Sequence, residues 1–131
     1  MKIKNIKFKA KQLNSGKWFE GDLVRLGNRV CIGGDHIKDG ITDVDPSTVC
    51  MFTGLKDCEG NEIWEGDIIS SPHFERVATV KWDDSLCGFK CSDVTGNINF
   101  SFTAIAHCSE WSIVGNKFDK KEVAYGKTNN N

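Results

Sequence analysis

The sequence has little of several features that mark specialised protein classes. It contains two prolines and one tyrosine in 131 residues. No apolar run approaches the roughly 18 residues that a membrane-spanning helix needs. The lysine-rich start also never opens into the apolar stretch of a signal peptide. We therefore expect no membrane association and a cytoplasmic location.

The six cysteines lack the spacing of a metal site. No C-x-x-C pair occurs. The closest two cysteines, Cys87 and Cys91, have neither a second closely spaced cysteine pair nor a histidine pair nearby to complete a zinc site. A disulfide framework is typical of small secreted proteins, and nothing in this sequence indicates secretion. We interpret the cysteines as reduced thiols, most of them buried, and predict no metal and no cofactor.

Composition and length favour one globular unit. Hydrophobic residues make up 39% and charged residues 27% of the chain, which excludes a chain that is disordered throughout. A unit of this size can bury about two thirds of its unfolded surface without metals or disulfides. We therefore expect a core of ordinary size.

Positive charge is concentrated at the start of the chain. Residues 1–17 contain six lysines and no acidic residue, whereas the remainder has eleven basic residues against eighteen acidic ones. Lys7, Lys9 and Lys11 alternate with apolar residues, which is typical of a strand with one charged face. Two interpretations follow: a phosphate-binding strip, or an edge strand whose lysines prevent pairing with other chains. We favour the edge strand.

The rest of the sequence predicts an all-β protein. Short segments rich in aromatic and β-branched residues alternate with turn sequences such as Gly27-Asn28, the turn 58–61 and the turn 93–97. Asp57 is expected to accept bonds from the turn 58–61, with Gly60 at positive φ. The predicted strands are 6–11, 18–26, 29–32, 42–44, 48–57, 62–69 with a second turn at 65–67, 76–82, 86–91, 98–102 and 110–118, with one helical turn at 103–107.

A short pattern occurs twice in the chain. Residues 19–24 read Phe-Glu-Gly-Asp-Leu-Val, and residues 64–69 read Trp-Glu-Gly-Asp-Ile-Ile. In both copies we expect the glycine to permit a sharp bend and the aspartate to bond the turn amides before a strand begins. Two copies are too few for a solenoid.

The sequence contains no recognisable arrangement of catalytic residues. His36, His73 and His107 lie in different surroundings, and the adjacent His107 and Cys108 would point apart on either a strand or a helix. His36 is interpreted as a loop residue, and Asp83-Asp84 as part of a hairpin turn. The sequence therefore predicts no catalytic residue and a protein that is not an enzyme.

Residues 44–68 have a pattern that resembles the YopX family of phage and prophage proteins. The pattern runs Thr53-Gly54-Leu55, Asp57, Gly60, Glu62-Ile63 and Glu65-Gly66-Asp67, and Val80-Lys81-Trp82, Gly88-Phe89 and Val114-Gly115-Asn116 follow at family spacing. The likeness covers most of residues 6–118. It implies a phage or prophage source, hence a bacterial host cell, and a mainly β fold with an SH3-like barrel. It implies no reaction.

With this resemblance we expect one unit over residues 1–118. It would contain N-terminal strands and loops at 1–47, a barrel part at 48–118 and at most one short helix. A polar tail, expected to be disordered, would follow at 119–131.

Protein binding is the function that we favour from the sequence. The chain has four tryptophans and eight phenylalanines, and SH3-like barrels bind ligands with aromatic residues beside acidic loops. The predicted binding residues are Trp64, Glu65, Asp67, Trp82 and Phe89. We expect a non-catalytic accessory protein that binds an unknown phage or host protein, with self-association into a homo-oligomer left open. The alternatives are nucleic-acid binding through Lys7, Lys9 and Lys11, which we disfavour, and an enzyme with a metal or thiol site.

Overall fold

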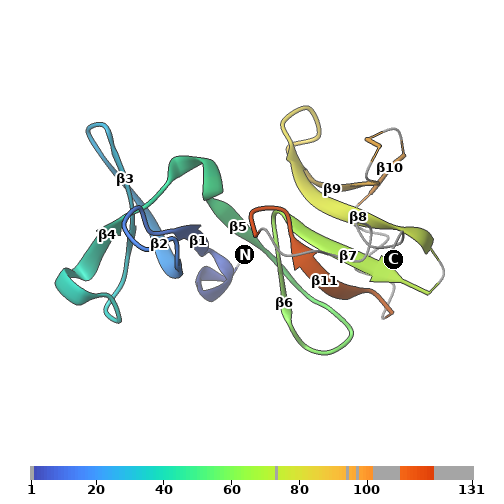
Figure 1. Cartoon of the computed structure of the whole chain (residues 1–131), viewed down its shortest axis with the longest axis horizontal. Coiled ribbons are helices and arrows are strands. Elements are labelled where there is room, and N and C mark those ends of the chain that lie inside the picture. The colour runs from blue at the N-terminus through green and yellow to red at the C-terminus, as the bar shows by residue number, and fades with distance from the viewer. Residues whose placement is uncertain (1, 73, 94, 97, 102–109, 120–131) are drawn as a thin grey trace. The chain divides into compact units, whose positions relative to one another are not determined.

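The chain is mainly β and contains two antiparallel sheets (Figure 1). A computed structural model describes residues 2–72, 74–93, 95–96, 98–101 and 110–119. This confirms the predicted all-β class. The helical turn predicted at 103–107, His73, His107, Cys108 and nearly all of the predicted tail lie outside the described residues.

The strands agree with most of the predicted segments. Their bounds are β1 Phe8–Lys11, β2 Trp18–Leu26, β3 Arg29–Gly33, β4 Ile41–Asp43, β5 Cys50–Lys56, β6 Glu62–Trp64, β7 Asp67–Ser71, β8 Phe74–Asp83, β9 Gly88–Asp93, β10 Asn99–Ser101 and β11 Ser112–Asn116.

The expectation of at most one short helix is wrong. The described residues contain three 3₁₀ helices of three residues each, η1 Ile3–Asn5, η2 Lys38–Gly40 and η3 Pro46–Thr48. In η3 the Asp45 carboxylate accepts the Ser47 amide at 3.0 Å, and Pro46 occupies the first helical position. Such capping turns connect strands without adding a helical layer.

The chain divides into two compact units, Met1–Phe52 and Thr53–Asn131. The division falls inside β5, a few residues after the subdivision that we expected at residue 47. Whether residues 1–118 fold as one cooperative unit stays a prediction.

The first unit has the strand order β4-β3-β2-β1, and the first residues of β5 pair with β1. Its core contains Ala10, Ile32, Ile37 and Val44. The Gly27-Asn28 hairpin is confirmed, because Leu26 of β2 lies opposite Arg29 of β3 and Gly27 has a φ of 60°. β1 lies between β2 and β5, so the interpretation of the lysine strand as an edge strand is wrong.

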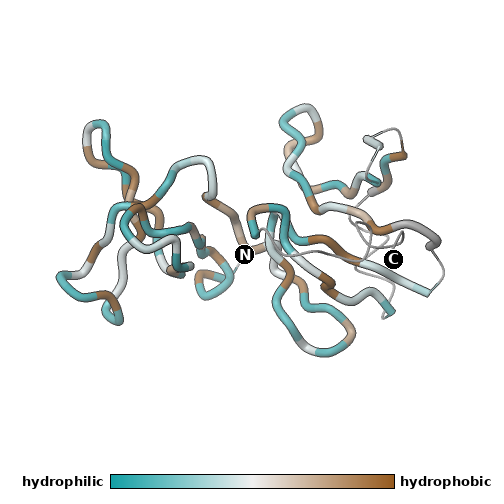
Figure 2. The backbone as a smooth tube through the Cα atoms, viewed as in Figure 1, coloured by the Kyte–Doolittle hydropathy of each residue, from teal (hydrophilic) through white to brown (hydrophobic). Residues whose placement is uncertain are grey.

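The second unit has the strand order β10-β9-β8-β7-β11, and β6 pairs with the part of β5 that belongs to this unit. Its core cluster is Ile63, Ile69, Ala78, Val80, Cys91 and Trp111. Among the described strands no pairing of β10 with β11 closes this sheet into a barrel. Apolar stretches follow the strands of both units, whereas the β5–β6 turn is mostly hydrophilic (Figure 2).

The two copies of the repeated pattern differ in structure. Gly66 lies in the turn between β6 and β7 with a φ of 91°, as the sequence predicts. Gly21 instead lies inside β2, where an added Cβ would clash with the Gly33 carbonyl oxygen. The turn expected at Gly21 is therefore wrong, and the glycine there allows a close approach of β3.

The part of the chain that the structure describes has no helix long and apolar enough to cross a membrane.

Candidate functional site

The β8–β9 hairpin presents an aromatic pair from two neighbouring strands (yellow in Figure 1). Trp82 of β8 lies directly opposite Phe89 of β9, and their ring centroids are 5.2 Å apart at an interplanar angle of 84°. This edge-to-face arrangement is favoured between aromatic rings. Phe89 packs against the core, whereas Trp82 remains 39% exposed. The pair thus joins the interior of the second unit to its surface.

Polar contacts fix the same hairpin. The indole Nε1 of Trp82 donates to Oδ1 of Asp84 at 2.7 Å. The neighbouring Asp83 accepts the Ser85 amide at 2.8 Å and forms an ion pair with Lys90 at 2.9 Å. The bonds from Ser85, and then the Lys90 ammonium, hold the pKa of Asp83 well below its usual range. The turn predicted at Asp83-Asp84 is therefore present, and it orients the indole.

One apolar residue of this turn was not among the predicted site residues. Leu86 lies between β8 and β9 and is 64% exposed. Neither Leu86 nor Asp84 could be singled out from sequence, because a turn residue of either type is ordinary.

The other predicted binding residues lie elsewhere in the second unit. Trp64 is buried at the end of β6, and its amide donates to Oδ2 of Asp67 at 2.7 Å. The second oxygen of Asp67 accepts Nδ2 of Asn116 at 3.0 Å. Glu65 is half-buried in the same turn. The structure therefore pairs Trp82 with Phe89, but assigns Trp64 and Asp67 to the turn that joins β6 to β7.

Of the three predicted lysines, Lys9 and Lys11 lie in β1 and Lys7 directly precedes it. Aromatic and acidic side chains surround them. The Lys7 ammonium is 3.1 Å from Oε2 of Glu20 and 4.9 Å from the centre of the Phe52 ring. The ammonium groups of Lys9 and Lys11 are 4.7 and 5.4 Å from the centre of the Trp18 ring. Much of their charge is thus engaged within the first unit.

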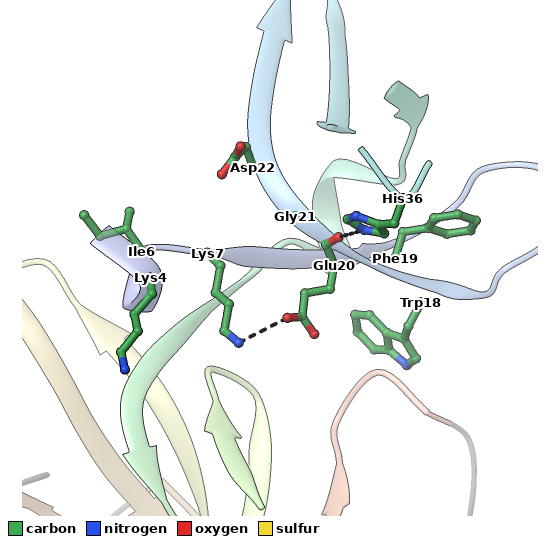
Figure 3. A pocket seen from close by; sticks show the side chains of 9 residues that line it. All are labelled: Lys4, Ile6, Lys7, Trp18, Phe19, Glu20, Gly21, Asp22 and His36. Carbon is green, nitrogen blue, oxygen red and sulfur yellow. Dashed lines mark hydrogen bonds and ion pairs between the residues drawn. The ribbon is translucent and has the colours of Figure 1, made fainter. Parts of the chain in front are cut away.

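A shallow groove of about 550 Å³ lies beside these lysines (Figure 3). Its lining consists of Lys4, Ile6, Lys7, Trp18, Phe19, Glu20, Gly21, Asp22 and His36. Lys7 points toward Glu20, and Nε2 of His36 lies 2.6 Å from the Glu20 carbonyl oxygen. The lining combines both signs of charge, so no ligand of one charge is favoured. His36 belongs to a loop, as the sequence predicts.

None of the described cysteines forms a disulfide bond. Cys31, Cys50 and Cys91 are buried, whereas Cys58 and Cys87 are exposed. Burial raises the pKa of Cys91 to about 12, which keeps this thiol protonated at neutral pH. Among the described residues, no group of three or more His, Cys, Asp or Glu side chains could hold a metal ion.

A model of one protein family, described as YopX protein, matches residues 4–123. The match covers most of the chain and includes both the lysine strand and the β8–β9 hairpin. The chain therefore belongs to the YopX family, as the motif at residues 44–68 indicates. A search of curated proteins gives no match.

Proposed function

We propose that this YopX-family chain is a protein-binding module and that the β8–β9 hairpin is its contact surface. One observation carries this proposal: Trp82 is large, apolar and exposed, yet held in one orientation by Phe89 and Asp84. Tryptophan is among the residues most enriched at the hot spots of protein interfaces, the few positions that contribute most of the binding energy. A side chain that is already ordered loses little conformational entropy when a partner binds.

The charge of the second unit supports a choice among partners. Thr53–Asn131 contains eight basic residues against twelve acidic ones, whereas Met1–Phe52 contains nine against six. A net negative unit repels polyanions and attracts basic protein surfaces. The hairpin is therefore better suited to a protein partner than to a nucleic acid.

A photocrosslinking experiment tests the proposal. A benzophenone amino acid replaces Leu86 in the full chain, and the same amino acid replaces the exposed Lys38 in the first unit as the matched control. The protein is expressed in the cell that carries its gene. We expect a discrete crosslinked product from position 86, lost when Trp82→Ala is added, and none from position 38. Equal products from both positions, or a product that survives Trp82→Ala, would contradict the proposal.

We further propose that the chain acts without catalysis. Asp57, Asp67 and Asp93 are buried carboxylates, and each accepts at least one backbone amide within or beside a turn. Carboxylates used in this way support strand connections, which favours a structural role for the most buried acids of the second unit. The context that we propose is a phage or prophage accessory protein in the cytoplasm of a bacterial cell.

An SH3-like barrel in residues 48–118 is also retained as a proposal. Its support is the order of short antiparallel strands in the second unit, in which β11 returns to pair with β7. Cross-strand nuclear Overhauser effects between the two ends of this sheet would establish closure. Amides of β10 and β11 that all exchange freely with solvent would argue for an open sheet.

Nucleic-acid binding through Lys7, Lys9 and Lys11 is the second candidate. The observation in its favour is that β1 is an inner strand, so protection of a sheet edge no longer accounts for the lysines. Against it, Lys7 is paired with Glu20 and the other two ammonium groups lie over Trp18. We expect no detectable binding at physiological salt.

Fluorescence anisotropy with duplex and single-stranded probes tests this candidate. Three phosphate contacts would give a log–log salt slope of about −2.7 for duplex DNA. Submicromolar binding with such a slope, lost when the three lysines become glutamine, would make nucleic-acid binding the leading function.

A further inference from the structure

The surroundings of Trp82 have a chemical character beyond being aromatic. Asp84 is exposed and its Oδ1 accepts the indole N–H at 2.7 Å. Within the part of the chain that the structure describes, no donor is bonded to its other oxygen, Oδ2. By contrast the Asp83 carboxylate is paired with Lys90 and bonded to Ser85. Asp84 therefore provides an uncompensated negative charge beside an oriented indole ring.

An aromatic face next to a carboxylate attracts a cation by two mechanisms. The ring quadrupole favours a positive charge over its face, and the carboxylate oxygen accepts a charge-assisted hydrogen bond. A guanidinium can use both at once, because it is planar and can stack on the ring while its edge N–H groups donate. A lysine ammonium is a compact, strongly hydrated charge and fits this arrangement less well.

We propose that the β8–β9 hairpin recognises an arginine side chain of a partner protein, stacked on Trp82 and bonded to Oδ2 of Asp84. The proposal rests on the protein-binding function proposed above and specifies what the partner presents. Leu86, 64% exposed in the same turn, provides an apolar contact for a residue next to that arginine. The net negative charge of the second unit adds attraction for a basic segment.

Two blocked tetrapeptides test the proposal directly on the full chain. Acetyl-Gly-Arg-Leu-Gly-amide carries the guanidinium, and its citrulline analogue has nearly the same shape without the charge. Binding is followed by the indole ¹H–¹⁵N NMR signal of Trp82, assigned by its loss in Trp82→Phe. We expect a saturable shift with the arginine peptide and an affinity about tenfold lower with citrulline. Equal affinity for both peptides, or no binding of either, would overturn the proposal.

A pair of matched variants separates charge from shape. Asp84→Asn keeps an oxygen that can accept the indole N–H but removes the carboxylate, and we expect it to lower the arginine-peptide affinity about tenfold. Asp35→Asn removes an exposed acid from a turn of the first unit and should leave the affinity unchanged. The Trp82 indole signal in Asp84→Asn reports whether the hairpin keeps its structure. An unchanged affinity in a folded Asp84→Asn variant would overturn the arginine assignment.

The crosslinking experiment distinguishes failure of this inference from failure of the proposed function. If Asp84→Asn crosslinks normally from position 86 while Trp82→Ala does not, the protein-binding function stands and arginine recognition is wrong. A second copy of this chain is the competing occupant, since its first unit exposes Arg25 and Arg29. Sedimentation experiments test this alternative. Concentration-dependent self-association that Trp82→Ala abolishes would show that the hairpin binds a second copy of this chain, and it would overturn the proposal of a different partner protein.

Discussion

The two units use polar residues in different ways. Among the described residues of the first unit, Thr48 is the single buried polar side chain, and the core beside it is apolar. The described part of the second unit buries three aspartates, which are Asp57, Asp67 and Asp93, together with Ser71, Ser92 and Asn116. Unpaired charge is costly to bury, so each of these carboxylates needs its own donors.

The donors lie in the turns between strands and in β6 and β11. Asp57 accepts the amides of Glu59 and Asn61 in the β5–β6 turn and that of Ile113 in β11. Asp93 accepts the Ile98 amide between β9 and β10 at 3.2 Å. The second unit therefore stabilises its turns with buried acids, whereas the hairpin at Gly27 in the first unit depends on backbone conformation.

The largest effect is expected at Asp67, the acid that joins β6, β7 and β11. Asp67→Ala would leave the Trp64 amide and the Asn116 side-chain amide without their acceptor. Each buried donor left unsatisfied costs about 1–3 kcal/mol. We expect the free energy of unfolding of the second unit to decrease by that amount for each donor. Urea denaturation measures the change, with the indole NMR signals of Trp64 and Trp111 as local probes.

The matching residue of the first unit provides the control. Asp22 occupies the same place in the repeated pattern but is exposed in β2. Asp22→Ala should change stability by less than about 0.5 kcal/mol. Equal losses in the two variants would contradict the difference between the units.

The second largest effect is expected from Gly66→Val. A β-branched residue at a φ of 91° is strained, which costs about 1–3 kcal/mol. The added Cβ would also lie 3.0 Å from Cε2 of Phe118. Urea denaturation should show a lower free energy of unfolding for the second unit.

Gly27→Val isolates the backbone strain from this contact. Gly27 has a φ of 60°, and an added Cβ there would have no atom within 4 Å. We expect Gly27→Val to cost less than Gly66→Val. A Gly66→Val variant that unfolds at the parent urea concentration would show that the β6–β7 turn is not formed as described.

These positions also show how far sequence can predict the fold. The turns at Gly27, Gly60 and Gly66 were predictable because Gly, Asn and Asp determine turn conformation locally. The turn predicted at Gly21 is wrong because the first copy of the repeated pattern lies in a strand, where Gly33 of β3 approaches closely. That approach depends on strand pairing, which a local pattern does not contain.

The candidate site was predictable only where residue type and local sequence determine the structure. Trp82 and Phe89 follow from their aromatic character and from the expected pairing of two neighbouring segments. The role of Asp84 depends on the orientation of one indole, and the inner position of β1 depends on pairing with β5, which lies about forty residues later. Neither has a signal in residue type or spacing.

A smaller effect is expected when the pH is lowered, and it should reduce the stability of the second unit. Burial alone would raise the pKa of Asp57, but the amides of Ile113, Asn61 and Glu59 together hold it below its ordinary value. A lowered folded-state pKa means that the stabilisation is present above the unfolded value of about 3.9 and is lost as the pH falls through the folded value. We expect the urea concentration at the unfolding midpoint of the second unit to decrease when the pH is lowered below about 4.

Asp57→Asn should flatten this dependence on pH and lower stability at neutral pH. Asp43 of the first unit is the comparison, because the Cys31 thiol, and then Arg29, lower its pKa as well. Asp43 forms its ion pair with Arg29 at an exposed position, where solvent screens the interaction. Asp43→Asn should therefore change the acid dependence less than Asp57→Asn, and the reverse order would contradict the role assigned to the buried acids.

The smallest effect is expected on the charged face of the first unit. Lys9→Met keeps the side-chain length but removes the ammonium group 4.7 Å from the centre of the Trp18 ring. An exposed cation–π contact contributes about 0.5–1 kcal/mol. Lys11→Met should cost less, because its ammonium lies at 5.4 Å, and the exposed Lys17→Met serves as the control. A double-mutant cycle of Lys9→Met with Trp18→Leu isolates the pair from other contacts of Lys9. A coupling energy of zero would show that Lys9 is not engaged by Trp18.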